Sequence, residues 1–227
     1  MPAPWFLYIP VISFALPVLA AGRRQRQLDL PMRYIAGWYA LLVVENLTAV
    51  IWRDFSATGN NLIVGKIFMP LEGTLVLLAL AEWQVQPVAR TAVRLLIPLY
   101  FVVWAFGMLY VEQSSVFSIF AGPILGFLVL GASLFAYVSR MQQEERPVLE
   151  TAWGWIVPGL SIFFAINVTV TIMLAIMQSR EQWDMMKQAV YLQVWIYFFA
   201  TLIVTAGFLW PTRHRSSGAS SSPSPSP

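Results

Sequence analysis

Residues Leu62–Trp83 read LIVGKIFMPLEGTLVLLALAEW. This stretch is long and apolar enough to cross the hydrocarbon core of a bilayer, which takes about 20 residues in a helix. It also carries two charged side chains away from its ends, Lys66 and Glu72. A charge at membrane depth costs a few kcal/mol or more unless it is paired. The stretch therefore predicts a transmembrane helix, and its charges are the first candidates for function.

Similar apolar stretches recur along the rest of the chain, and the connections between them are short. They predict an all-α, polytopic membrane protein with a seven-transmembrane-helix bundle over residues 1–211. Residues 212–227 are rich in Ser and Pro and are expected to form a disordered cytoplasmic tail. The other six predicted spans are Pro4–Ala21, Tyr34–Trp52, Leu95–Val111, Val116–Tyr137, Trp153–Met177 and Ala189–Trp210.

The composition excludes several classes of protein. Hydrophobic residues make up 58% of the chain and charged residues 11%, which rules out a soluble enzyme, a disordered protein and a nucleic-acid-binding domain. The chain has no cysteine, so it forms no disulfide, thiolate metal site or iron–sulfur cluster. The only histidine, His214, lies in the tail. We therefore expect neither a cofactor nor a metal site in the bundle.

Positive charges are distributed unevenly between the two sides of the predicted bundle. Three lie on one side, Arg53, Arg180 and Lys187. Cytoplasmic loops carry the excess of Lys and Arg, so we expect the N-terminus outside and the C-terminus in the cytoplasm, in the inner (plasma) membrane of a bacterial cell. Ten lie on the cytoplasmic side: Arg23, Arg24, Arg26, Arg33, Arg90, Arg94, Arg140, Arg146, Arg213 and Arg215.

Three charged residues fall at membrane depth: Glu45, Lys66 and Glu72. At 1.5 Å per residue, Glu45 and Lys66 lie within about 10 Å of the outer ends of adjacent antiparallel helices, so the simplest expectation is an ion pair between them. Glu72 is then the unpaired, titratable group, suited to relaying protons or binding a ligand. Amides at membrane depth are its candidate hydrogen-bonding partners: Asn46, Asn167 and Gln193.

The stretch Asn60–Glu72, NNLIVGKIFMPLE, resembles a signature of small uncharacterised bacterial membrane proteins with seven transmembrane helices. In that family two asparagines precede the third helix and a Pro-x-Glu follows inside it, while histidine is usual at the position of Lys66. The resemblance implies the seven-helix fold and no particular activity. It also implies that Asn60 and Asn61 lie at the outer mouth of the helix, where they are expected to cap its N-terminus.

Three functional hypotheses remain open. The first is a protein that binds a small molecule or lipid in an intramembrane polar pocket, for transport or sensing, between the second, third, sixth and seventh predicted helices. The second is a non-catalytic structural or assembly subunit that holds a partner membrane protein. The third is an enzyme acting on lipid with Glu45 or Glu72 as general acid or base. No nucleophile–base pair or metal ligand set supports this third hypothesis. A retinal protein is also disfavoured, because the last predicted span, Ala189–Trp210, lacks the lysine that a retinal Schiff base needs.

Overall fold

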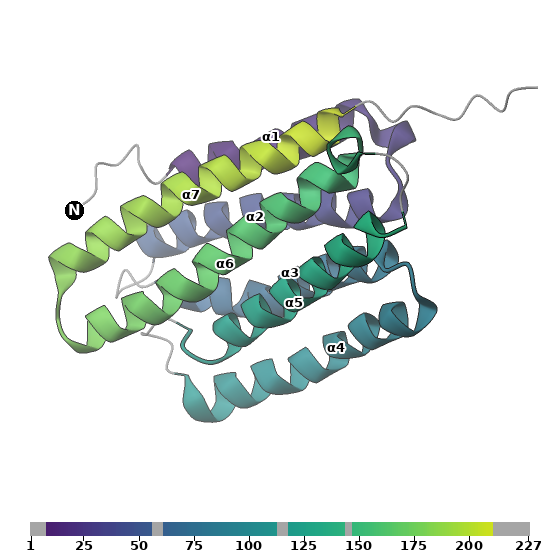
Figure 1. The fold of residues 1–227 in the computed structure, drawn as a ribbon. Helices are drawn as coiled ribbons and strands as arrows, with labels where there is room; N and C mark the ends of the chain where they lie inside the picture. The colour runs from purple at the N-terminus through teal and green to yellow at the C-terminus, as the bar shows by residue number, and fades with distance from the viewer. Residues whose placement is uncertain (1–7, 56–60, 113–117, 144–146, 211–227) are drawn as a thin grey trace, which may run out of the picture.

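The computed structural model describes residues 8–55, 61–112, 118–143 and 147–210 (Figure 1). These residues form helices and turns and contain no strand, so the predicted all-α fold is confirmed. The predicted tail, 212–227, lies outside the described residues. The long helices are α1 (Tyr8–Arg23), α2 (Leu30–Phe55), α3 (Leu62–Trp83), α4 (Pro87–Phe106), α5 (Ala121–Met141), α6 (Ala152–Ser179) and α7 (Trp183–Leu209).

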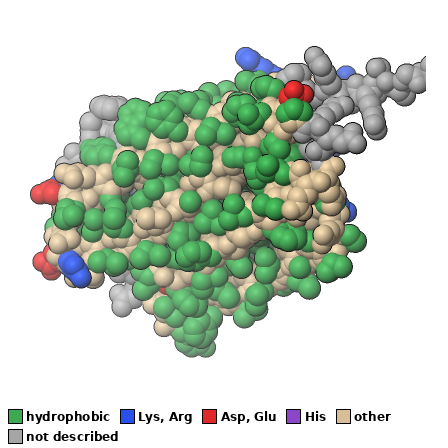
Figure 2. Space-filling view, in the orientation of Figure 1, with side chains coloured by type: hydrophobic (Ala, Val, Ile, Leu, Met, Phe, Trp, Pro, Cys, Tyr) green, Lys and Arg blue, Asp and Glu red, His purple; other side chains and the backbone are tan. Residues whose placement is uncertain are grey.

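Six helices, α2 to α7, are long and apolar enough to cross a membrane, and α1 is a shorter apolar helix. Large hydrophobic side chains stay exposed along them, such as Val88 at 79% and Leu109 at 74%. Figure 2 shows these side chains covering the flank of the bundle, with most of the visible charged groups toward its two ends. Such a belt fits lipid rather than water, so the chain is a multi-pass membrane protein.

The helices form a closed ring with one helix outside it (Figure 1). Helix α1 packs between α2 and α7, α7 packs on α6, α6 on α5, α5 on α3, and α3 on α2. Helix α4 lies outside this ring and packs mainly against α3. The ring therefore encloses side chains from α2, α3, α5 and α6, which are the elements that build the site described below.

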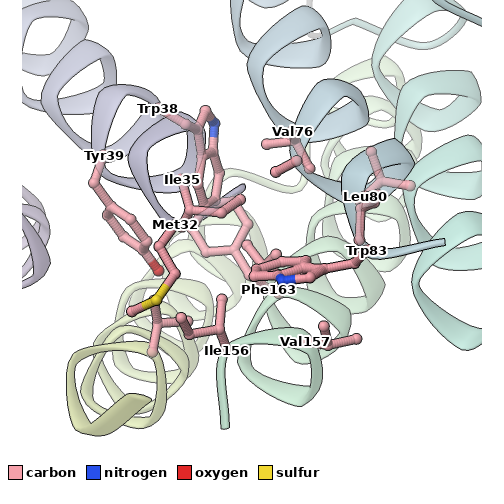
Figure 3. Packing of buried hydrophobic residues seen from close by; sticks show 14 of the residues in the cluster. Met32, Ile35, Trp38, Tyr39, Val76, Leu80, Trp83, Ile156, Val157 and Phe163 are labelled. Carbon is pink, nitrogen blue, oxygen red and sulfur yellow. The ribbon is translucent and has the colours of Figure 1, made fainter. Parts of the chain in front are cut away.

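Aromatic side chains fill the middle of the ring. Trp38 stacks on Phe164 with ring centroids 5.6 Å apart and meets the edge of Phe163 at 5.1 Å. Tyr197 on α7 stacks on Phe163, with ring centroids 4.2 Å apart. Figure 3 shows Trp38, Tyr39 and Phe163 from α2 and α6 directed toward one another. We call Phe14, Trp38, Tyr39, Phe163, Phe164 and Tyr197 the central aromatic cluster.

Small residues allow two pairs of helices to pack closely. A Cβ atom added to Gly126 on α5 would lie 2.1 Å from Val168 Cγ2 on α6. A Cβ atom on Gly159 of α6 would lie 2.6 Å from Val204 Cγ2 on α7. In a membrane, helices associate through van der Waals contact of this kind, because lipid tails are as apolar as the helices. Glycine is thus required at both contacts.

Two arginines bind the ends of helices at the pole where α1, α3, α5 and α7 end. Arg24 donates hydrogen bonds to the carbonyl oxygens of Phe208 and Trp210 at the end of α7. Arg140 Nε donates to the carbonyl oxygen of Trp83, the last residue of α3, at 2.9 Å. The last carbonyl groups of a helix have no partner within the helix. These two arginines supply partners and join neighbouring helices.

Candidate functional site

A cavity of about 240 Å³ lies among α2, α3, α5 and α6, near the ends where α3 and α5 begin. At roughly 30 Å³ for each water molecule, it has room for about eight. Its apolar wall includes Phe164 of the central aromatic cluster. Its polar lining is Glu45, Lys66, Glu72, Ser118, Asn167 and Thr171. Four of the residues predicted from the sequence therefore meet in one cavity: Glu45, Lys66, Glu72 and Asn167.

Two carboxyl groups face each other in this cavity. Glu45 on α2 and Glu72 on α3 both line it, and their carboxyl groups are close enough to interact. The helices approach closely there, since a Cβ atom on Gly65 of α3 would lie 3.1 Å from Glu45 Oε1. A hydrogen bond between two carboxyl groups requires a proton on one of them, because ionised carboxylates only accept and repel each other. A proton on one member of the pair would remove this repulsion and allow such a hydrogen bond.

The indole of Trp38 lies beside this carboxyl pair. It interacts with Glu72, although Trp38 Nε1 does not reach the geometry of a regular hydrogen bond with any described residue. The same indole stacks on Phe164. Trp38 thus connects the carboxyl pair with the central aromatic cluster, of which Phe164 lines the cavity.

The predicted ion pair between Glu45 and Lys66 is wrong. The Lys66 ammonium lies 3.3 Å from Glu112 Oε2, and both side chains are buried. Glu45 instead lies against Gly65, and successive residues of a helix point about 100° apart. Lys66 is therefore turned away from Glu45, toward the chain that connects α4 with α5.

Glu112 is held by several partners at the beginning of α5. Its Oε1 accepts hydrogen bonds from Ser118 Oγ at 2.7 Å, Phe120 N at 2.9 Å and Ala121 N at 3.0 Å. Burial alone would raise the pKa of Glu112, but these hydrogen bonds and the Lys66 ammonium outweigh it and lower that pKa. Glu112 is an ionised carboxylate at a helix N-terminus, where the exposed N–H groups favour an anion.

The backbone of Lys66 is fixed by a second contact. Pro70 lies four residues further along α3 and has no N–H to donate to the Lys66 carbonyl oxygen. Trp104 Nε1 on α4 donates to that oxygen instead, at 2.8 Å. The missing hydrogen bond of α3 is thereby replaced from outside the ring. The Lys66 ammonium thus contacts Glu112, which follows α4, and the Lys66 carbonyl oxygen contacts Trp104 on α4.

The other predicted site residues are not in the cavity. Asn46 Nδ2 donates to the carbonyl oxygen of Leu42 within α2, at 2.8 Å. Gln193 Nε2 donates to Tyr197 Oη within α7, at 2.8 Å. Among the described residues, the cavity lining comes from α2, α3, α5 and α6 and the segment before α5. The expected contribution of the seventh predicted helix is therefore wrong, and α5 takes its place.

The two asparagines expected at the mouth of α3 have different outcomes. Asn61 occupies the N-cap position of α3, but its side chain accepts no hydrogen bond from the helix. Its backbone carbonyl accepts from Val64 N at 3.1 Å. The expected side-chain cap at Asn61 is therefore wrong. Asn60 lies outside the described residues.

Sequence reasoning missed Glu112 and Ser118, and it did not foresee the contact of Trp104 with Lys66. Glu112 directly follows the predicted span Leu95–Val111, so hydropathy places it in the connection to the next span. One signal could have found it: that span ends on the side of the membrane where the preceding, antiparallel helix carries Lys66 near its beginning. A π-helical turn, Gly107–Val111, follows α4 and is closed by a hydrogen bond from Glu112 N to the Gly107 carbonyl oxygen at 2.8 Å. Glu112, which comes directly after this turn, reaches Lys66 on α3.

Comparison with protein-family models, curated proteins and solved structures finds no match. The resemblance of Asn60–Glu72 to a bacterial family therefore stays a prediction. Among the described residues, no group of three or more His, Asp or Glu side chains is placed to hold a metal ion. The chemistry that the cavity offers is reversible binding of protons at the carboxyl pair and hydrogen bonding to a small solute.

Proposed function

We propose that this protein binds a small polar solute in the cavity and exchanges it for a proton, as a transporter or sensor. The proposal rests on the carboxyl pair, Glu45 and Glu72, which lines a half-open cavity with both polar and apolar walls. We place the protein in a bacterial inner membrane with its N-terminus outside, because positive charge predominates at the opposite pole. In that orientation the cavity lies in the outer half of the bundle.

The favoured solute is a small cation. The Lys66 charge is already opposed by Glu112, so a carboxyl pair that loses its proton has no cationic side chain among the described residues as an ion-pair partner. A cation such as a small organic ammonium ion would replace that proton and pair with the carboxylates. A volume of about 240 Å³ lies below the roughly 300 Å³ at which drug-sized pockets begin. This limits the solute to a few non-hydrogen atoms.

The test is calorimetric titration of the detergent-purified protein with methylammonium, repeated in two buffers with different ionisation enthalpies. The difference between buffers counts the protons released on binding. We expect the wild-type protein to release a proton when methylammonium binds and the Glu72→Gln variant to release none. Glu82→Gln is the matched control, since Glu82 lies on the same helix and pairs with Arg94. Unchanged proton release in Glu72→Gln would contradict the proposal, as would equal binding of acetate.

A structural or assembly subunit is the second candidate, and one observation favours it. Lys66 connects helices through both its ammonium, to Glu112, and its carbonyl oxygen, to Trp104. Intramembrane polar groups that only join helices have this arrangement. For such a subunit, Glu45→Gln and Lys66→Met reduce the yield of folded protein, and methylammonium gives no heat in any variant.

A further inference from the structure

A second cavity, of about 620 Å³, lies between α1 and α2 at the opposite pole of the bundle. Its inner wall is made of small apolar residues, including Val18, Ala36 and Ala40. Two arginines, Arg26 and Arg33, stand at its rim. The cavity thus combines an apolar slot along two membrane helices with a positively charged entrance.

The arginines are available for a ligand. Arg26 is exposed and forms no hydrogen bond or ion pair with the residues that the structure describes. Arg33 Nε donates to the carbonyl oxygen of Leu28 at 3.1 Å. This bond orients the guanidinium group and leaves the N–H groups of its two terminal nitrogens able to donate to a ligand. Guanidinium groups bind phosphate oxygens in a planar, forked geometry. Two of them at one rim suit a phosphate group.

One acidic residue stands close to this rim. Asp29 Oδ1 accepts a hydrogen bond from Met32 N at 3.0 Å, at the start of α2. Burial raises the pKa of Asp29 above its ordinary value, against the opposing influence of Arg140 and Arg33. The two rim arginines, Arg26 and Arg33, outnumber this one aspartate, so the rim keeps a net positive charge.

The depth of the cavity distinguishes a lipid from a free anion. Arg26 precedes α2 and Arg33 lies in its first turn, at one end of the helix Leu30–Arg53 that is apolar enough to cross a membrane, so both arginines are placed near the lipid headgroups. Ala40 lies seven residues beyond Arg33, about 10 Å further into the membrane at 1.5 Å per residue. A free phosphate ion would leave this apolar slot empty, whereas an acyl chain would fill it.

We propose that this cavity binds one anionic phospholipid. Its phosphate lies between Arg26 and Arg33, and one acyl chain lies along Val18, Ala36 and Ala40. A zwitterionic phosphatidylcholine binds less tightly, because its choline group brings a positive charge to a positive rim. The site is independent of the carboxyl-lined cavity and of the function proposed for it.

The test is native mass spectrometry of the full chain in a mild detergent, titrated with phosphatidylglycerol or phosphatidylcholine of the same acyl chains. We expect one phosphatidylglycerol bound in preference to phosphatidylcholine. Arg26→Gln and Arg33→Gln should each weaken phosphatidylglycerol binding about fivefold. Arg180→Gln is the matched control, because Arg180 is an exposed arginine at the other pole and should leave binding unchanged.

A second pair of variants tests the slot. A Cβ atom on Gly22, which lines the cavity, meets no atom within 4 Å, and the same is true of Gly131 on α5, which does not line it. Gly22→Leu should therefore fold and exclude the acyl chain, while Gly131→Leu should bind phosphatidylglycerol normally. Circular dichroism confirms folding in both.

Four outcomes would overturn the proposal. Equal weakening by Arg180→Gln would show general attraction of an anionic lipid to a basic protein. Unchanged binding in Arg26→Gln and Arg33→Gln would remove the headgroup site. Displacement of the lipid by glycerol phosphate, with Gly22→Leu unaffected, would assign the site to a free phosphate. A co-purified protein that blocks lipid binding would assign the groove to a partner helix.

Discussion

Trp104 on α4 supplies the hydrogen bond that Pro70 removes from α3. Pro70 has no N–H to donate to the carbonyl oxygen of Lys66, and Trp104 Nε1 donates to that oxygen instead, at 2.8 Å. Proline inside a membrane helix is tolerated where a neighbouring helix satisfies the freed carbonyl. This relationship explains why α4, which lies outside the ring, is nevertheless attached at the level of the candidate site.

Replacing Trp104 with Phe should therefore destabilise the protein. The substitution keeps an aromatic ring but leaves the Lys66 carbonyl without its donor, which costs about 1–3 kcal/mol for a buried polar group. The measurement is the free energy of unfolding in mixed micelles. In a Pro70→Ala background the residue at position 70 regains its N–H, so the same Trp104→Phe change should cost clearly less. Equal costs in the two backgrounds would contradict this account.

The buried ion pair between Lys66 and Glu112 gives a second prediction. Lys66→Met or Glu112→Gln alone leaves the partner charge buried without its counter-ion, which costs about 3–5 kcal/mol in the free energy of unfolding. The double variant should be more stable than the sum of the two losses predicts. The exposed pair of Arg94 and Glu82 is the control, where each single change should cost about 1 kcal/mol or less. Additive losses for the buried pair would show that the two groups do not interact.

Stability should also fall in acid in a way that depends on Glu112. Its pKa in the folded protein is lower than the ordinary value of 4.5, so the folded state binds that proton less tightly than the unfolded state. The resulting stabilisation is present above about pH 4.5 and is lost as the pH falls through the folded pKa. Unfolding midpoints measured from pH 6 downward should show this loss in the wild-type protein and a weaker one in Glu112→Gln. Parallel curves for the two proteins would contradict the assignment.

Packing between α5 and α6 should depend on Gly126. A Cβ atom there would meet Val168 Cγ2, so Gly126→Ala should lower the free energy of unfolding by about 1–3 kcal/mol. Gly131→Ala, on the same helix in open space, should be neutral or stabilising, because alanine favours a helix by up to about 1 kcal/mol. Adding Val168→Ala to Gly126→Ala should recover part of the loss. No recovery would place the strain elsewhere.

The orientation proposed for the bundle can be tested with single cysteines, since the chain contains none. Gln182 lies between α6 and α7, and Gln142 follows α5 at the other pole; both side chains are exposed. A membrane-impermeant maleimide should label Gln182→Cys in intact cells. Gln142→Cys should be labelled only after the membrane is opened. The reverse pattern would place the N-terminus in the cytoplasm.

The sequence predicted the helices well because long apolar stretches leave little choice in a bilayer. Helix α3 has the predicted bounds, Leu62–Trp83. Helix α4 begins at Pro87 instead of the predicted Leu95. Proline is accepted in the first turn of a helix, and Arg90 and Arg94 extend this end of the helix beyond its apolar part. Hydropathy detects the apolar part alone.

The sequence predicted how deep in the membrane the candidate site residues lie, but it did not predict which way their side chains point around each helix. Distance from a helix end placed Glu45, Lys66 and Glu72 in the outer half of the membrane, at about 10, 6 and 15 Å from the helix ends, and all three do line one cavity. Hydropathy does not reveal which way each side chain turns. Lys66 therefore pairs with Glu112 rather than Glu45, and Gln193 bonds within its own helix. Rotation about the axis is set by packing contacts such as that at Gly65, which a single sequence does not encode locally.

The arginines that bind helix ends have a consequence for biogenesis. In the proposed orientation, Arg24 and Arg140 help to retain their loops in the cytoplasm while the chain is being inserted. In the finished bundle the same two side chains hold the last carbonyl groups of α7 and α3. Each therefore acts at two stages, first in choosing the topology and later in joining helices. Removing either charge would impair insertion and assembly together, and one phenotype would report on both.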